Sequence, residues 1–315
     1  MRLGTRGSAL ATTQARVVGR ALRQAGTDVE IVTVRTEGDL SERPLTEIGG
    51  TGVFATALRT ALLRREIDLA VHSLKDLPVA AYPGLRIAAI TAREDARDAV
   101  ITATGQPLGD LDASARVGTG SPRRAGQVAA LAPAVQVVDI RGNVGTRIAK
   151  LRSGEVDALI LAAAGLQRLG RADEITHTLS YADMLPAPGQ GALAVECRAP
   201  EQASSSATER DRAGDEVIAR ACAELDDAAT RDCVSAERAM LEALEAGCTA
   251  PVGALATHAA DGYELTGWIS HQGWSARISA NGRDPSELGQ HVARELLRNI
   301  AAHDPQQIPP LECES

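Results

Sequence analysis

The sequence predicts an α/β protein with two related, doubly wound domains flanking a cleft, followed by a small α+β domain with an antiparallel sheet. An internal repeat is the first observation, because Arg2–Ser8 resembles Arg116–Ser121 and Glu66–Val71 resembles Glu155–Ile160, in the same order. Within each repeat, short apolar strands alternate with amphipathic helices. After about residue 229, hairpin signals replace this alternation.

The first repeat follows the order strand, helix, strand, helix, strand. We expect these elements at Leu3–Thr5, Ala9–Gln24, Val29–Val34, about Phe54–Arg64 and Leu69–His72. The strands are rich in β-branched and aliphatic residues, whereas the helices carry apolar residues at helical spacing. Elements in this order form a sheet covered by helices, and ligands bind beyond the carboxyl ends of its strands.

The second repeat has the same order of elements. We expect strands at Val117–Thr119, Val135–Ile140 and Ala158–Ala162, with helices after Ser121 and after Asn143. A serine followed by a proline is typical of a helix start, because the hydroxyl caps the first turn and proline has no N–H to leave unpaired.

The chain then returns toward the first domain. Pro186–Arg198 is rich in proline and glycine and contains the strand-like run Ala192–Val195, which we interpret as the return crossing. Ala199–Arg212 is dominated by serine, alanine and charged residues, and we expect it to be a flexible excursion.

The third region differs in kind. We expect a helix and three strands, at about Ala229–Glu245, Val252–His258, Tyr263–Ser270 and Ser275–Ala280. Asp261-Gly262 and Asn281-Gly282 are typical of hairpin turns. Asp284–Glu287 predicts the start of a last helix, with a capping residue, a first-turn proline and a capping-box glutamate. Ile308–Ser315 is expected to be loose.

These elements predict three domains, which suits a chain of 315 residues at roughly 100–200 residues per domain. The first domain comprises residues 1–95 with 191–221, the second residues 96–190, and the third residues 226–315.

Composition excludes several classes of protein. The net charge is −8, whereas nucleic acids and anionic membranes require a basic face. Met1–Arg6 leads directly into a predicted strand without a signal-like apolar core, and no window approaches the roughly 20 apolar residues of a membrane span. We therefore expect a cytoplasmic protein. The five cysteines form no C-x-x-C pair, which argues against a disulfide framework or a zinc site.

Arginine replaces lysine almost throughout the chain. Lys75 and Lys150 are the only lysines among 33 basic residues. Two explanations stay open, a bias in coding composition and a need for guanidinium groups that clamp carboxylates or phosphates. Five of the arginines follow a predicted strand or begin a predicted helix, namely Arg6, Arg123, Arg124, Arg141 and Arg147.

Such positions favour anions, because free backbone N–H groups and the helix dipole lie there. A single arginine is as readily a solvated surface charge, but five converging on one cleft predict a polyanionic ligand. No phosphate-binding loop motif follows a strand, and Gly49–Gly52 lacks the lysine of such a loop, so we interpret it as a gate or hinge.

Asp76 lies in Val71–Pro78, directly after a predicted buried strand and next to Lys75. A carboxylate among cations stays ionised and can exchange protons with a cationic intermediate. A structural Lys–Asp pair is the open alternative. His72 is expected to be a packed strand residue, because no companion metal ligands have suitable spacing. Cys248 follows a glycine in a loop, where a thiol can be exposed and reactive.

Together these segments resemble the porphobilinogen deaminase (hydroxymethylbilane synthase) family. The match is collinear from Arg2 to at least Gly253 and rests on six motifs in order: Val71–Pro78, Gly118–Arg124, Arg141–Arg147, Ala162–Gly170, Pro186–Leu193, and Ala236–Met240 with Glu245–Cys248.

The resemblance implies a fold and a reaction. The first two of three domains would be similar to type II periplasmic binding proteins. The enzyme, a transferase of haem-type tetrapyrrole biosynthesis, would condense four porphobilinogen molecules head to tail, with loss of ammonia, and release the linear tetrapyrrole by hydrolysis. The family implies a monomer and a dipyrromethane cofactor joined by a thioether to Cys248.

The resemblance also assigns residues. Asp76 matches the catalytic carboxylate, which would stabilise the azafulvene cation formed as ammonia leaves and help remove the displaced proton. The acetate and propionate groups of the pyrrole rings would be held by Arg6, Lys75, Arg123, Arg124, Arg141, Arg147 and Arg168. Further matches to cofactor, substrate and hinge segments are Ser8, Phe54, Thr119, Ser121, Asn143 and Gln190.

Some positions depart from the family pattern. Glu47 and Thr51 stand beside the glycine-rich loop where lysine is common, Gly120 and Pro122 replace serine and leucine, and the excursion after Arg198 is long. A non-catalytic, two-lobed module that binds or senses polyanions is the alternative function. Such a module needs neither the Asp76 carboxylate nor a modified cysteine.

Overall fold

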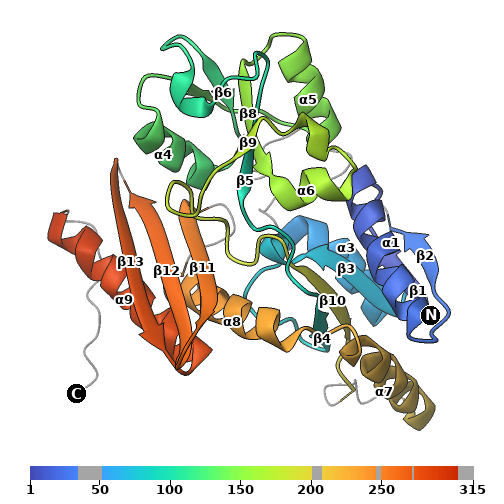
Figure 1. Cartoon of the computed structure of the whole chain (residues 1–315). Helices are drawn as coiled ribbons and strands as arrows, with labels where there is room; N and C mark the ends of the chain where they lie inside the picture. The colour runs from blue at the N-terminus through green and yellow to red at the C-terminus, as the bar shows by residue number, and fades with distance from the viewer. Residues whose placement is uncertain (35–51, 201–207, 246–249, 272, 304–315) are drawn as a thin grey trace, which may run out of the picture.

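The computed structural model describes residues 1–34, 52–200, 208–245, 250–271 and 273–303, with the side chains of residues 52–54 and 303 excepted. Within these residues the chain forms three sheets (Figure 1). Two are mixed five-stranded sheets covered by helices, and the third is a three-stranded antiparallel sheet. The predicted fold class, two α/β units and a small α+β unit, is confirmed.

The first sheet has the strand order β2-β1-β3-β10-β4. Its strands are β1 (Arg2–Thr5), β2 (Glu30–Thr33), β3 (Leu69–Ser73), β4 (Leu85–Ile90) and β10 (Leu193–Arg198). The covering helices are α1 (Ala9–Gln24), α3 (Gly52–Leu63) and α7 (Glu209–Ala223). Strand β10 runs antiparallel between β3 and β4, which confirms the predicted return crossing.

The second sheet has the order β7-β6-β8-β5-β9. Its strands are β5 (Asp98–Thr102), β6 (Arg116–Gly118), β7 (Gln136–Val138), β8 (Ala158–Ala162) and β9 (His177–Thr178). The accompanying helices are α4 (Pro122–Leu131), α5 (Val144–Arg152) and α6 (Ala163–Arg168). Helix α6 packs beside α1 of the first unit, so the two units touch there (Figure 1).

The internal repeat is confirmed in atomic detail. Strands β1 and β6 occupy equivalent places, each parallel to two neighbours. The backbone N–H of Arg2 donates to Asp68 at 2.8 Å, and that of Arg116 donates to Asp157 at the same distance. In both units, the arginine side chain also bonds that aspartate and a carbonyl of the preceding turn. The repeated letters therefore specify a repeated strand edge.

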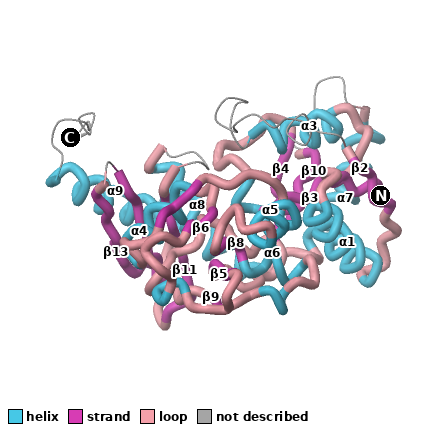
Figure 2. Tube along the Cα trace, turned by 90° about the horizontal axis from the view of Figure 1, so that it is seen from above, coloured by secondary structure: helices cyan, strands magenta, loops and turns pink. Residues whose placement is uncertain are grey.

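The third sheet consists of β11 (Val252–Ala259), β12 (Gly262–His271) and β13 (Trp274–Gly282). Helices α8 (Ala228–Ala243) and α9 (Pro285–His303) pack on it around a core that includes Met240, Leu265 and Val292. Seen from above, α9 and β13 lie at one end of the molecule and β2 at the other (Figure 2). The strands of each sheet fall within one predicted domain range, while the boundaries themselves stay a prediction.

Two local predictions are wrong. Asn281-Gly282 is not a hairpin turn but the end of β13, and the β12–β13 turn lies between His271 and Trp274. Gly282 packs closely against α9, since an added Cβ would lie 3.2 Å from the Leu288 side chain. The second error concerns the end of the predicted excursion, because α7 begins at Glu209 with a capping box between Thr208 and Asp211; residues 201–207 of the excursion lie outside the described residues.

The remaining helix starts behave as predicted. Ser121 accepts the Arg124 N–H with proline at the first helical position, and Asn143 accepts the Thr146 N–H at 2.9 Å. Asp284 accepts the Glu287 N–H at 2.8 Å. Strands β4, β5 and β9 and helix α6 were not predicted, and the expected loose tail at residues 308–315 lies outside the described residues.

Candidate functional site

Two buried leucines, Leu74 and Leu77, hold the turn that carries Asp76 in place. Strand β3 ends at Ser73 and leads into a short 3-10 helix, Leu74–Asp76. Leu74 and Leu77 are almost fully buried, so the side chains between them are left partly exposed. Gln14 of α1 donates to the Ser73 hydroxyl at 2.7 Å and holds the strand end in place. The local sequence thus presents Lys75 and Asp76 together.

A buried carboxylate, Asp98, connects this turn with the second sheet. It is fully buried at the start of β5 and accepts hydrogen bonds from Arg123 (2.7 Å), Arg124 (2.8 Å) and the Gln190 amide (2.9 Å). The other end of Gln190 accepts from the Lys75 ammonium at 3.2 Å. We call these five residues, Lys75, Asp98, Arg123, Arg124 and Gln190, the Asp98 cluster.

The Asp98 cluster contains three cations and one anion. Desolvation by burial, together with Arg124, lowers the pKa of Lys75 to about 8, although Asp76 and Asp98 oppose this shift. The pKa of Asp98 is lowered despite its burial, because both guanidinium groups stabilise the carboxylate. Arg123 Nε is buried without a hydrogen-bond partner. The cluster therefore has positive charge to spare for an anionic ligand.

A second group of cations lies at the start of α5. Arg147 donates from Nε to the Gly142 carbonyl at 2.8 Å, and Arg141 pairs with Asp139 at 3.0 Å on the surface. Desolvation lowers the pKa of Arg147 to about 10, with Arg124 the next largest cause. Arg147 is thus within electrostatic range of the Asp98 cluster. Of the predicted clamp residues, Arg124 and Arg147 are thus near enough to disfavour each other's charge, whereas Arg141 pairs with Asp139 at the surface.

Other predicted site residues have structural partners. Arg168 is almost buried, with Nε 3.1 Å from Glu94, and it donates to the Gly191 carbonyl. Ser8, Ser121 and Asn143 accept from backbone N–H groups as helix caps. The Thr119 hydroxyl accepts the Ser121 N–H at 3.2 Å. Arg6 is partly exposed just after β1.

His72 is buried in β3, with Nε2 3.4 Å from the buried Glu196 carboxylate, which confirms the expected packed strand residue. Cys248, Glu47, Thr51 and the side chain of Phe54 lie outside the described residues. The predicted attachment loop is bounded by α8, which ends at Ala243, and by β11, which begins at Val252.

Two neighbours on α8 connect the third unit to this site. Glu237 is fully buried and accepts from the Gly189 N–H at 2.7 Å, the Ala256 N–H at 2.9 Å and the Arg93 guanidinium at 3.1 Å. Arg238 donates to the carbonyls of Leu77 (3.1 Å) and Pro78 (2.8 Å), directly after Asp76.

Sequence reasoning assigned no role to Glu237, Arg238 or Asp98. The run Ala236–Met240 was among the family motifs, so the signal for the first two was present, whereas nothing in the sequence marked Asp98.

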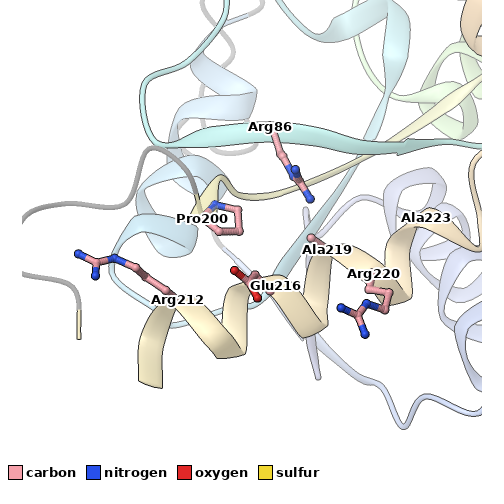
Figure 3. A pocket seen from close by; sticks show the side chains of 7 residues that line it. All are labelled: Arg86, Pro200, Arg212, Glu216, Ala219, Arg220 and Ala223. Atoms are coloured by element: carbon pink, nitrogen blue, oxygen red, sulfur yellow. The ribbon is translucent and has the colours of Figure 1, made fainter. Parts of the chain in front are cut away.

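A pocket of about 480 Å³ lies between α7 and β4, away from this site (Figure 3). Arg86, Arg212 and Arg220 line it, but their guanidinium groups do not converge in Figure 3. Arg86 is paired with Cys197 in the register of β10, whereas Leu193 is paired with Ser73. The pocket is therefore about 13 Å farther along the strand from the Asp76 turn.

The comparisons with known proteins bear on the whole chain. The family model described as "Porphobilinogen deaminase, dipyromethane cofactor binding domain" matches residues 1–206, and "Porphobilinogen deaminase, C-terminal domain" matches residues 232–298. The chain belongs to the porphobilinogen deaminase family. Porphobilinogen deaminase 1 of Streptomyces coelicolor is 55% identical over 320 residues, which cover 96% of each chain. Porphobilinogen deaminase of Mycobacterium tuberculosis is 52% identical over 310 residues, 94% of this chain and 96% of the relative.

Membership of the porphobilinogen deaminase family confirms the predicted enzyme class, a transferase of tetrapyrrole biosynthesis. The match over residues 1–206 likewise confirms the dipyrromethane cofactor. A periplasmic substrate-binding protein from Coxiella burnetii superposes with a TM-score of 0.43 at 14% identity, over 76% of this chain and 96% of that one. In the described part of the chain, no helix has the length and apolar character needed to cross a membrane.

Proposed function

We propose that this chain condenses four porphobilinogen molecules head to tail, releases ammonia at each step and frees a linear tetrapyrrole by hydrolysis. One observation carries this proposal beyond family membership. The turn that bears Asp76 also carries Lys75, which is connected through Gln190 to a buried carboxylate that pairs with two further cations, Arg123 and Arg124. A carboxylate for proton transfer therefore lies beside groups that bind carboxylates.

The donor set fits a dipyrromethane. Its acetate and propionate groups require cations, which Lys75, Arg123 and Arg124 supply, and the unpartnered Arg123 Nε offers a further donor. When bound through Cys248, the dipyrromethane supplies the pyrrole terminus to which the first substrate ring is joined. Arg6, Arg141, Arg147 and Arg168 would bind the carboxylates of further rings as the chain lengthens, assisted by Ser8, Phe54, Thr119, Ser121 and Asn143.

Asp76 performs the proton chemistry in this proposal. Its carboxylate accepts the pyrrole N–H of a bound substrate ring and stabilises the positive charge that develops on that ring as ammonia leaves. It then takes the proton displaced when the next ring adds. Asp76 in turn favours the protonated form of Lys75, its neighbour on the same turn.

The proposal includes action as a monomer in the cytoplasm on a small-molecule substrate, with neither nucleic acid nor a membrane as a partner. Size-exclusion chromatography with light scattering tests the monomer, and a dimeric mass would contradict it. The domain ranges 1–95 with 191–221, 96–190 and 226–315 belong to the same proposal.

Intact mass spectrometry tests the attachment and the chemistry together. Protein from a porphobilinogen-producing host is expected to carry an increment of two pyrrole units that is absent from Cys248→Ser. Asp76→Asn should keep this increment and its fold but lose nearly all turnover, because an amide cannot take up the proton. An unmodified wild-type mass with no turnover after incubation with porphobilinogen would support the non-catalytic binding module instead.

A further inference from the structure

We propose that Asp98 is a positioning residue, which sets the carboxylate-binding cations of the two α/β units relative to each other. It orders Arg123 and Arg124 directly and reaches Lys75 through the Gln190 amide. The inference deepens the proposed function, because it concerns how the same site recognises the carboxylates of its substrate. Asp98 itself touches no substrate in this proposal.

The geometry leaves Asp98 little freedom. It is fully buried, and both oxygens are occupied, since Oδ2 accepts from Arg123 while Oδ1 accepts from Arg124 and Gln190. The two arginines are further fixed by donation to the carbonyls of Leu185 (2.6 Å) and Ile160 (3.2 Å). Guanidinium groups fixed in this way lose little conformational freedom when they bind a ligand.

Gln190 extends this order across the two units. Its side chain is almost completely buried and donates to Asp98 and to the Ala96 carbonyl at 2.7 Å, while its oxygen accepts from Lys75. An amide with both ends bonded transmits the position of Asp98, in the second sheet, to the turn after β3. Lys75 and the arginine pair therefore keep a defined spacing.

Asp98 also moderates the charge of the site. The charged groups that act on Lys75 are Arg123 and Arg124, which disfavour its protonated form, and Asp76 and Asp98, which favour it. Without Asp98, three cations would remain with Asp76 as the one anion among these groups. Lys75 would then release its proton at lower pH than in the wild type, and the site would lose a cation there.

The experiment compares Asp98→Asn with wild-type holoenzyme. Asparagine keeps the shape of the side chain and removes its charge. Steady-state rates with porphobilinogen are measured from neutral to alkaline pH, after intact mass has shown the bound dipyrromethane. We expect the alkaline limb of kcat/KM to move down by about one pH unit and KM to rise about tenfold. If the dipyrromethane fails to load in Asp98→Asn but loads in the control variant described below, the positioning role of Asp98 is also supported.

Asp215→Asn is the matched control. Asp215 is also buried and also pairs with two arginines, Arg198 at 2.7 Å and Arg65 at 2.8 Å, but it lies on α7 at the far end of the first sheet. The Asp215→Asn variant should be less stable than wild type but should still load the dipyrromethane. The alkaline limb of its kcat/KM profile should stay at the wild-type pH. If Asp98→Asn does not fold, Gln190→Met provides the same test, since it separates Lys75 from Asp98 and is expected to lower the limb.

The inference would be overturned if folded, loaded Asp98→Asn had its alkaline limb of kcat/KM at the wild-type pH and an unchanged KM. An alkaline limb at the wild-type pH in Gln190→Met would overturn it as well. A lower KM would also overturn it, because Asp98 would then compete with substrate carboxylates for the arginines. An equal downward shift of the alkaline limb in Asp98→Asn and Asp215→Asn would point to general destabilisation and would contradict the proposal. Failure of the proposed function is distinct, because wild type itself would then show no turnover.

Discussion

Glu237→Gln should destabilise the whole assembly, although Glu237 contacts no substrate in the proposed mechanism. Its carboxylate is fully buried on α8 and bonds three groups from different parts of the chain: the Arg93 guanidinium, the Gly189 N–H and the Ala256 N–H. Arg93 in turn donates to the Gln190 carbonyl at 2.8 Å. The Glu237 side chain thus bonds Arg93 and Gly189, which lie in the two segments that run between the α/β units, and also Ala256 of the third sheet.

The size of the effect follows from this geometry. Glutamine has nearly the same shape as glutamate, but its NH₂ group would face N–H donors and could not accept their hydrogen bonds. Arg93, with only 13% of its side chain exposed, would also lose its counter-ion. Removing one partner of a buried ion pair costs about 3–5 kcal/mol. Unfolding entropy of about 2.1 cal/mol/K per residue, applied to 315 residues, converts this into a Tm lower by about 5–8 °C.

Thermal unfolding followed by circular dichroism measures the change. Glu295→Gln is the control, because Glu295 pairs with Arg298 on the exposed surface of α9 and its loss should cost no more than about 0.5 kcal/mol. A Tm of Glu237→Gln within about 1 °C of wild type would refute the reasoning, because the buried pair would then contribute no more than an exposed one.

The other two predictions concern the catalytic turn. Arg238→Met removes both donors to the Leu77 and Pro78 carbonyls while keeping an apolar stem, so kcat should fall about tenfold with a smaller change in KM; a lower Tm with unchanged kcat would contradict a positioning role. Because Lys75 has its pKa lowered to about 8, it is charged below that pH, and kcat/KM should decline as pH rises through about 8. Arginine stays charged, so Lys75→Arg should shift this limb upward, and a limb at the wild-type pH would show that another group titrates.

Features encoded by neighbouring residues were predictable from the sequence. The helix caps at Ser121, Asn143 and Asp284 need only a polar side chain and the N–H three residues later. The local sequence is therefore enough to predict them. The repeat was equally readable, because Arg2 with Asp68 and Arg116 with Asp157 build the same strand edge twice. The hairpin assigned to Asn281-Gly282 failed because the same two letters can end a strand: both residues pair with β12, and Gly282 packs closely against Leu288 of α9.

The site residues fall into the same two groups: some were predictable from neighbouring residues, and others depend on distant parts of the chain. The arginines that follow strands were predictable, since strand ends and helix starts favour anions whatever lies around them. Asp98 was not, because its partners are 25, 26 and 92 residues away and meet only once the second sheet and the crossing have formed. Its identity also looks unfavourable locally, because it is a carboxylate at the start of the fully buried strand β5. Such a residue is tolerated only where cations neutralise it, but because strand β5 was not predicted, the sequence did not mark Asp98 as the point where distant arginines converge.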